Sequence, residues 1–208
     1  MSIPSVVVMA TKGIPALADQ LPSDGRRARR HRSRDLAVDA LLDLLDEGVA
    51  RPTAQLVAER SGVSLRSIFR IFDDVETLHT EAAARQLERH RDLFVEVPST
   101  GPLADRIAAI VEAHDRLYDV VAPVRRAALR AAPDSQALTA QLALARGWHR
   151  SDMERIFATE LAGADADLRD ALEAALSFET WDQVATAQAL KPTARRAAIA
   201  RLVHALLD

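Results

Sequence analysis

An arginine-rich run near the start of the sequence holds the densest charge in the chain. Six of the nine residues 26–34 are arginine, and the stretch 25–72 carries a net charge of +4 from ten arginines and six acidic residues. The stretch 73–208 carries a net charge of −6. A basic end joined to an acidic body indicates a polyanionic partner for that end alone.

The segment 53–72 carries a second set of residues with a chemical pattern. Thr53 and Ser64 each precede a short helix-forming stretch, where a side-chain hydroxyl accepts a backbone N–H at the start of the helix. Other residues of the segment suit two crossing helices joined by a tight turn. Ala58 is small where the helices cross, Gly62 can adopt the positive φ of the turn, and Val63 and Ile68 supply apolar side chains between the helices. Such a pair is typical of the helix-turn-helix motif, whose second helix enters the major groove of DNA.

Helices are expected to make up nearly everything from Ser33 onward. Alanine and leucine dominate there, and glycine and proline fall only where helices would end. Residues 1–25 contain three prolines and two glycines without a sustained period, which predicts a flexible extension. Ser33 is expected to cap the first helix, whose apolar stripe includes Leu36, and 98–102 is expected to be a linker. The expected helices span 34–47, 54–60, 65–71, 74–94, 103–121, 123–132, 134–160, 165–188 and 192–207.

The composition excludes several classes of protein. Hydrophobic residues make up 49% and charged residues 27% of the 208 residues, which is typical of a globular protein. There is no cysteine, which excludes disulfides, thiol catalysis and cysteine-bound zinc. No apolar run approaches the roughly 18 residues of a membrane span. The short apolar run 5–10 follows no basic residue, so no signal peptide is expected and the chain is expected to be cytoplasmic.

Motifs of catalysis and metal binding are also missing from the sequence. It contains no glycine-rich phosphate loop, no HExxH and no nucleophile elbow. The six histidines are scattered without the spacing of metal ligands. We therefore expect no catalytic residues, no metal site and no cofactor.

The pattern around the two short helices resembles the DNA-binding domain of the TetR family of transcriptional regulators. The resemblance covers about residues 33–80, and the remaining chain resembles the family only in the number and length of its helices. It implies an all-α protein with an N-terminal three-helix DNA-binding domain, followed by a helical effector-binding and dimerisation body. The residues that carry the resemblance are Thr53, the run 58–64, Ile68, Phe69, Phe72 and the run 76–78. The implied divisions are a flexible extension 1–25, an arginine arm and DNA-binding domain 26–73, and the body 74–208.

The resemblance assigns DNA contacts to individual residues. Thr53 and Ser64 would hold phosphates at the starts of the two helices. Phe69 stands where the family usually has a tyrosine that touches phosphate, and Val75 stands where it usually has a lysine, so two phosphate contacts are weakened. Side chains expected to reach base edges are Arg66, Ser67 and Arg70, with Leu65 as a candidate contact to a thymine methyl group. The arm expected beside the minor groove consists of Arg26, Arg27, Arg29, Arg30 and Arg32.

The last two expected helices carry the expectation of a homodimer. The helix 165–188 has two apolar sides, whereas a helix with one solvent-exposed side needs only one apolar side. One side holds Leu168, Leu172, Ala175 and Leu176, and the other Ala171, Ala174, Phe178, Trp181, Val184 and Ala185. The last helix offers Ala198, Ile199, Leu202, Ala205 and Leu206. The resemblance implies that these helices pair with their copies; a well-buried helix within a monomer is the alternative.

Two histidines mark a candidate effector site in the body. His114 and His149 each lie at the centre of the apolar stripe of a long helix. A buried imidazole needs a partner, so each is either a core histidine bonded to protein groups or a polar contact in a ligand cavity. Tyr118, Trp148 and Phe178 are the other candidates for lining that space. The effector would then be a largely apolar small molecule.

The function expected from these features is that of a transcriptional regulator. It would bind a palindromic site on double-stranded DNA as a homodimer and act as a repressor that a small molecule releases. A helical small-molecule-binding protein with a vestigial DNA-reading domain is the first alternative, and a small all-α enzyme is a more distant one.

Overall fold

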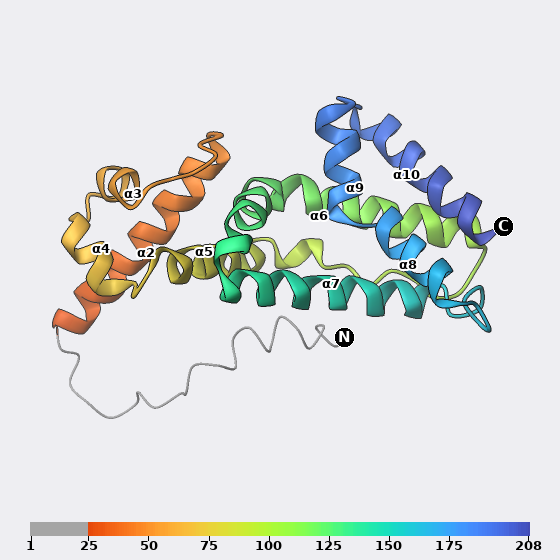
Figure 1. Ribbon diagram of the computed structural model, residues 1–208, viewed down its shortest axis with the longest axis horizontal. Helices are drawn as coiled ribbons and strands as arrows, with labels where there is room; N and C mark the ends of the chain where they lie inside the picture. Colours follow the sequence, from red (N-terminus) through yellow and green to blue (C-terminus); the bar gives the residue numbers. More distant parts are fainter. Residues whose placement is uncertain (1–24) are drawn as a thin grey trace. The chain divides into compact units, whose positions relative to one another are not determined.

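The computed structural model describes residues 25–208, apart from the side chains of Arg26, Val75 and Glu76 (Figure 1). The extension expected over residues 1–25 lies outside this range except for its last residue. Within the described range the chain forms helices and turns and no strand, which confirms the all-α class. The α-helices are α2 (Gly25–Asp46), α3 (Ala54–Ser61), α4 (Leu65–Ile71), α5 (Val75–Arg89), α6 (Leu103–Ala131), α7 (Gln136–Ile156), α8 (Ala166–Ala175), α9 (Phe178–Asp182) and α10 (Pro192–Leu207). Shorter 3₁₀ turns are η1 (Arg91–Leu93) and η2 (Ala132–Asp134), and η3 (Gln183–Ala187) is a π-helical turn.

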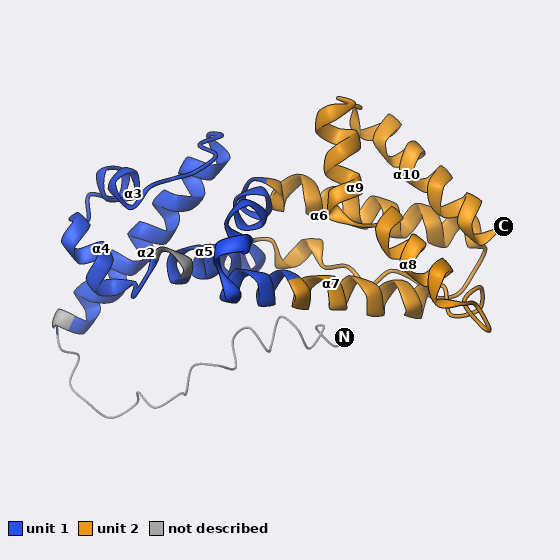
Figure 2. Ribbon diagram, in the orientation of Figure 1, with its two compact units in different colours: residues 1–89, 123–142 blue, residues 90–122, 143–208 orange. Residues whose placement is uncertain are grey.

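The chain folds into two compact units that are not linear in the sequence (Figure 2). Of the described residues, unit 1 contains 25–89 and 123–142, and unit 2 contains 90–122 and 143–208. The helices α6 and α7 therefore each contribute to both units.

The core of unit 1 is built around α2. This helix contacts α3, α4 and α5, and its buried residues cover an arc of roughly 200° around the helix axis. Val38 and Leu42 are buried within this arc, whereas Leu36 falls outside it and is 51% exposed, so its predicted place in the buried stripe is wrong. Two residues of α6, Val124 and Ala127, complete the same cluster.

The start of α2 differs from the prediction. The helix begins at Gly25 rather than after Ser33, so the described part of the arginine run forms its first turns. Arginine and alanine both favour the helix, and no glycine or proline interrupts 26–46. Helix propensity therefore prevails over the capping signal of Ser33.

Other helix boundaries also differ from the prediction: the helices expected to end at 94 and 160 end at Arg89 and Ile156, and two differences concern breaks inside predicted or observed helices. Proline in a helix interior costs about 3 kcal/mol, yet α6 continues through Pro123, where its buried neighbours Ala122 and Val124 offset that cost. The predicted helix 165–188 is instead broken at Ser177, whose hydroxyl accepts the N–H of Thr180 at 3.1 Å and starts α9. The carbonyl of Leu176 is consequently left without the helical partner that an unbroken helix would give it.

Substitution by alanine is expected to change the free energy of unfolding in opposite directions at Gly62 and Gly147. Both lie where an added Cβ would meet nothing within 4 Å, but Gly62 has φ +70° whereas Gly147 lies inside α7. Gly62→Ala should lower the free energy of unfolding by ~1 kcal/mol because a side chain disfavours left-handed backbone. Gly147→Ala should raise it by a similar ~1 kcal/mol through helix propensity. Urea titrations of the two variants measure both effects, and two shifts of the same sign would contradict the assigned backbone conformations.

Candidate functional site

Local capping fixes the two short helices α3 and α4. The Oγ1 of Thr53 accepts the backbone N–H of Leu56 at 3.2 Å, and the Oγ of Ser64 accepts that of Ser67 at 3.3 Å. Gly62 closes α3 in the left-handed conformation, as the turn requires. Residues on the inner sides of the pair are buried, namely Val57, Ala58, Val63, Ile68 and Ile71. The two helices are therefore held at a defined angle by their own caps and by one shared core.

The outer side of α4 presents three large side chains. Arg66, Phe69 and Arg70 are exposed, whereas Ile68 and Ile71 on the opposite side are buried. At 100° per residue the three exposed side chains lie within about 100° of one another around the helix. A helix that buries one side and presents two arginines on the other has the form of an element that contacts an anionic or hydrogen-bonding partner.

Two of the four predicted base-contact residues on α4 are less exposed than Arg66 and Arg70. Leu65 is half-buried and packs against the core of unit 1. Ser67 is also half-buried, and its hydroxyl accepts that of Ser64 at 2.9 Å. A leucine at the edge of a core and a serine bonded to a cap both serve the fold of the unit. The outer face of α4 is accordingly narrower than the four-residue face expected from the sequence.

The arginine arm is a helical segment with charge on every side. Arg27, Arg29, Arg30 and Arg32 are exposed, and their spacing distributes them around the whole circumference of α2. Arg29 donates its Nε–H to the carbonyl of Gly25 at 3.2 Å. The side chain of Arg26 lies outside the described residues. A helix that is polar all round has no side to bury in its own unit, so these guanidinium groups remain in water.

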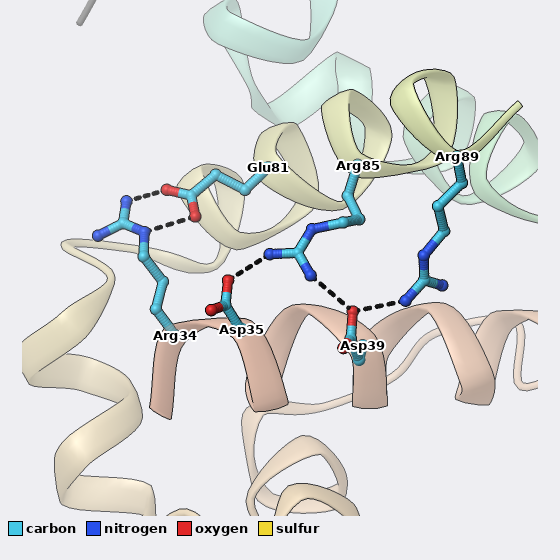
Figure 3. Close-up of polar contacts among 6 residues, drawn as sticks. All are labelled: Arg34, Asp35, Asp39, Glu81, Arg85 and Arg89. Atoms are coloured by element: carbon cyan, nitrogen blue, oxygen red, sulfur yellow. Dashed lines mark hydrogen bonds and ion pairs between the residues drawn. The ribbon is translucent and has the colours of Figure 1, made fainter. Parts of the chain in front are cut away.

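Arg34 has a different role from the arginines that precede it. Its guanidinium makes two hydrogen bonds to the carboxylate of Glu81 on α5, one of them at 2.6 Å (Figure 3). The guanidinium carbon also lies 5.2 Å from the centre of the Phe72 ring. It also donates to the carbonyl of Ile71 at 3.5 Å, at the end of α4. Arg34 therefore joins α2, α4 and α5 within unit 1.

A row of ion pairs continues this connection along α2 and α5. Arg85 pairs with Asp35 and, at 3.0 Å, with Asp39, and Arg89 reaches the same Asp39 oxygen at 2.8 Å (Figure 3). These side chains are partly exposed, so each pair contributes at most about 1 kcal/mol. Together with Arg34 they fix how α5 lies along α2, which carries the arginine arm.

All five candidate effector residues come together in one aromatic cluster of unit 2. His149 is central, with ring centroids 4.7 Å from Trp148, 4.8 Å from His114 and 5.5 Å from Tyr118. Tyr118 in turn contacts Phe178 at 5.5 Å, edge to face. His114, Tyr118 and Phe178 are buried, and Trp148 and His149 are half-buried. The cluster thus runs from the surface of unit 2 into its core.

The buried end of the cluster is tied to the helix break at Ser177. The carbonyl of Leu176 accepts the hydroxyl of Tyr118 at 3.1 Å and lies 3.2 Å from Nδ1 of His114. Because a carbonyl only accepts, Nδ1 of His114 carries the proton and Nε2 is the acceptor. Nδ1 of His149 lies 3.4 Å from that Nε2 and must therefore donate to it. His114 is bonded to protein groups at both nitrogens, which favours the core interpretation of this residue.

Burial makes His114 a source of acid sensitivity. Desolvation lowers the pKa of His114 to about 4 from its ordinary value of 6.5. Between these two pH values the unfolded chain binds a proton that the folded chain does not, so stability falls as the pH drops through that window, by ~1.4 kcal/mol per pH unit at most. The stability of wild-type protein should therefore decline more steeply from pH 6.5 to 4.5 than that of His114→Gln. Urea titrations across this range measure both slopes, and equal slopes would contradict the assignment.

A buried ionic network adjoins the aromatic cluster through Trp181, which contacts Tyr118 and Phe178, and it was not predicted from the sequence. The Oδ1 of Asp115 accepts the indole N–H of Trp181 at 2.9 Å and a hydrogen bond from Arg195. Oδ2 of Asp115 accepts a hydrogen bond from Arg196 at 3.2 Å. The Arg195 guanidinium also lies over the Trp181 ring, 4.6 Å from its centre. One signal in the sequence could have indicated that Arg195 is buried. Arg195, Ile199 and Val203 are spaced four residues apart, so the arginine lies on the same side of α10 as two apolar residues.

The apolar sides predicted for the last helices are only partly available to a partner. Leu172, Leu176, Phe178, Trp181 and Val184 are all buried within the single chain, so the break between α8 and α9 lets both apolar sides pack in unit 2. On α10, Ile199 and Val203 are buried, whereas Leu202 is 47% exposed and Ala205 is exposed. Residues from both apolar sides of the segment 165–188 are thus buried within one chain, and the two sides do not by themselves require a second subunit.

Two other kinds of site are absent from the described part of the chain. No group of three or more histidine, cysteine, aspartate or glutamate side chains in residues 25–208 is arranged to hold a metal ion. In the same part of the chain, no helix combines the length and the apolar character needed to cross a membrane.

The chain was also compared with known proteins. No protein-family model, no curated protein and no solved structure matches it.

Proposed function

We propose that the chain is a sequence-specific DNA-binding transcriptional regulator of the TetR type, in which α4 of unit 1 enters the major groove. The observation that carries this proposal is the division of α4 into two sides. Ile68 and Ile71 anchor it in the core, while Arg66 and Arg70 project into solvent. Arginine presents the paired donors that match O6 and N7 of guanine. In this proposal α3 and α4 form the helix-turn-helix of a three-helix DNA-binding domain with α2.

The electrostatics of unit 1 support the same proposal. The exposed arginines of the arm stand at the start of α2, and Arg34 ties the adjoining turn to the end of α4. In this proposal the arm follows the DNA backbone or the minor groove beside the site that α4 reads. Thr53 and Ser64 would lie where the N-termini of α3 and α4 face DNA phosphates. Each cap side chain accepts one backbone N–H of its helix, and other N–H groups of the first turn can therefore donate to a phosphate.

The homodimer is supported by apolar residues that α8 and α10 leave open to solvent. Leu202 is 47% exposed, Ala174 and Ala205 are exposed, and Leu168 is half-buried. Contact with the same surface of a second copy would remove these groups from water. A two-fold dimer would present two copies of α4 to one palindromic operator.

Release by a small molecule is the part of the proposal that concerns unit 2. The half-buried Trp148 and His149 are the cluster members that a largely apolar effector can reach without unpacking the core. His114, Tyr118 and Phe178 lie behind them, so ligand contact there would require the cluster to open. The proposed regulator is thus a cytoplasmic repressor whose effector enters beside Trp148.

The test is selection of bound sequences from a pool of random double-stranded DNA with the full-length protein. The expected result is enrichment of one motif with two-fold symmetry over successive rounds. A matched control carries Arg146→Ala and Arg201→Ala, two exposed arginines of unit 2, and should enrich the same motif. Recovery of unchanged random sequence by the wild-type protein would overturn the proposal and favour a helical small-molecule-binding protein.

The arginine arm is expected to set the salt dependence of binding. A variant with alanine at positions 27, 29, 30 and 32 keeps α2 helical, since alanine is the best helix former. It should bind every DNA sequence more weakly, and the slope of log K against log salt should fall by about 0.9 for each phosphate that the arm no longer neutralises. Fluorescence anisotropy at several salt concentrations measures the slope. An unchanged slope would show that the arm makes no phosphate contact.

A further inference from the structure

Phe69 is the large apolar side chain on the outer face of α4. It is 55% exposed, whereas Phe72, three residues later, is 1% exposed and completes the core of unit 1. The phenyl ring has no conventional hydrogen-bond donor or acceptor, so it offers apolar contacts and contacts to its ring face. Removing the ring should leave the fold intact because it is not part of the core cluster.

The position of Phe69 divides the outer face of α4 into two kinds of surface. At 100° per residue Phe69 lies between half-buried Leu65 on one side and Arg66 on the other, with Arg70 beyond Arg66. One edge of the face is therefore apolar and the other edge is cationic. A surface with this division matches a partner that presents an apolar group beside hydrogen-bond acceptors.

We propose that Phe69 recognises a thymine in the operator half-site through apolar contact with its C5-methyl group. This inference rests on the proposed function, in which α4 lies in the major groove. The thymine methyl is the apolar group that base pairs present in that groove, beside the O6 and N7 acceptors of guanine that suit arginine. The half-burial of Leu65 against the core makes Phe69 the better placed side chain for this contact.

The test replaces each thymine of the selected operator by deoxyuridine, which removes the methyl group and leaves the hydrogen-bonding edges unchanged. Binding is measured by fluorescence anisotropy for wild-type, Phe69→Ala, Phe69→Leu and Arg66→Ala proteins. For the wild-type protein, replacing one particular thymine of each half-site by deoxyuridine should weaken operator binding about fourfold. That factor corresponds to the ~0.8 kcal/mol expected for burying one methyl-sized apolar group. Phe69→Ala should bind both probes equally, and Phe69→Leu should keep part of the difference.

Arg66→Ala serves as the matched control on the same face. It should weaken binding to both probes by the same factor and keep the fourfold ratio between them, because the arginine does not contact the methyl group. An enriched operator with no methyl-sensitive thymine would overturn this inference and leave the proposed function standing, as would a methyl sensitivity that survives in Phe69→Ala. A random pool that yields no enriched sequence would overturn the proposed function, and this inference with it.

Discussion

Replacing Arg66 or Arg70 by alanine is expected to weaken operator binding by ~1–3 kcal/mol for each side chain. Each loss corresponds to roughly 5- to 150-fold in Kd. Both guanidinium groups are exposed on α4, and no buried residue of unit 1 depends on them, so the fold should be unchanged. The base preference at one position of each half-site should relax at the same time. Titration of fluorescent operator and of single-base variants measures both effects.

Lysine at these positions separates charge from geometry. Arg66→Lys keeps the positive charge but loses the planar fork that bonds two acceptors of one guanine. It should therefore keep the salt dependence of wild-type binding and lose its base preference. If both alanine variants retained wild-type affinity and sequence preference, the outer face of α4 would not be the reading surface.

Replacing Asp115 by alanine is expected to lower the free energy of unfolding by ~3–5 kcal/mol. The carboxylate is 4% exposed and pairs with the 7% exposed guanidinium of Arg195 while accepting the indole N–H of Trp181. Without it, Arg195 would remain buried among apolar groups without its principal counter-charge. Urea denaturation followed by circular dichroism measures the loss.

Asp119 provides the matched control, since it also faces Arg195 from α6. Its carboxylate is 66% exposed and lies 3.5 Å from the guanidinium, so Asp119→Ala should cost less than ~1 kcal/mol. The paired variant Asp115→Leu with Arg195→Met should recover most of the stability because it removes both charges together. Equal losses for Asp115→Ala and Asp119→Ala would contradict the buried network.

The short helices α3 and α4 were predictable because their signals are local. The caps Thr53 and Ser64 and the left-handed Gly62 act on their own neighbours, and the bounds predicted from them agree with the structure within a residue. The prediction placed all five aromatic candidates of unit 2 in one site, and they do form one cluster. The bonding of His114 to the Leu176 carbonyl was not predictable, because the acceptor lies 62 residues away, at a helix break that was itself not predicted.

The errors arose where local signals compete or where partners are distant in the sequence. Ser33 has a capping hydroxyl, yet the helix runs through it because the residues before it also favour helix. The break at Ser177 depends on donors from α6 that take up the freed carbonyl of Leu176. Arg195 is buried because its partner Asp115 comes from a helix 80 residues earlier in the chain. An arginine is ordinarily assigned to the solvent-exposed side of a helix, and its alignment with Ile199 and Val203 was the one signal against that assignment.

The most direct test of the account is a hydroxyl-radical footprint of the full-length protein on the operator recovered by selection. We predict two protected patches of equal extent about a two-fold axis, with centres about one helical turn of DNA, roughly 34–36 Å, or a multiple of it apart. Both patches should disappear together in the variant that lacks Arg66 and Arg70. Uniform protection without a repeated pattern, or protection that the double variant retains in full, would contradict the claim that α4 reads DNA.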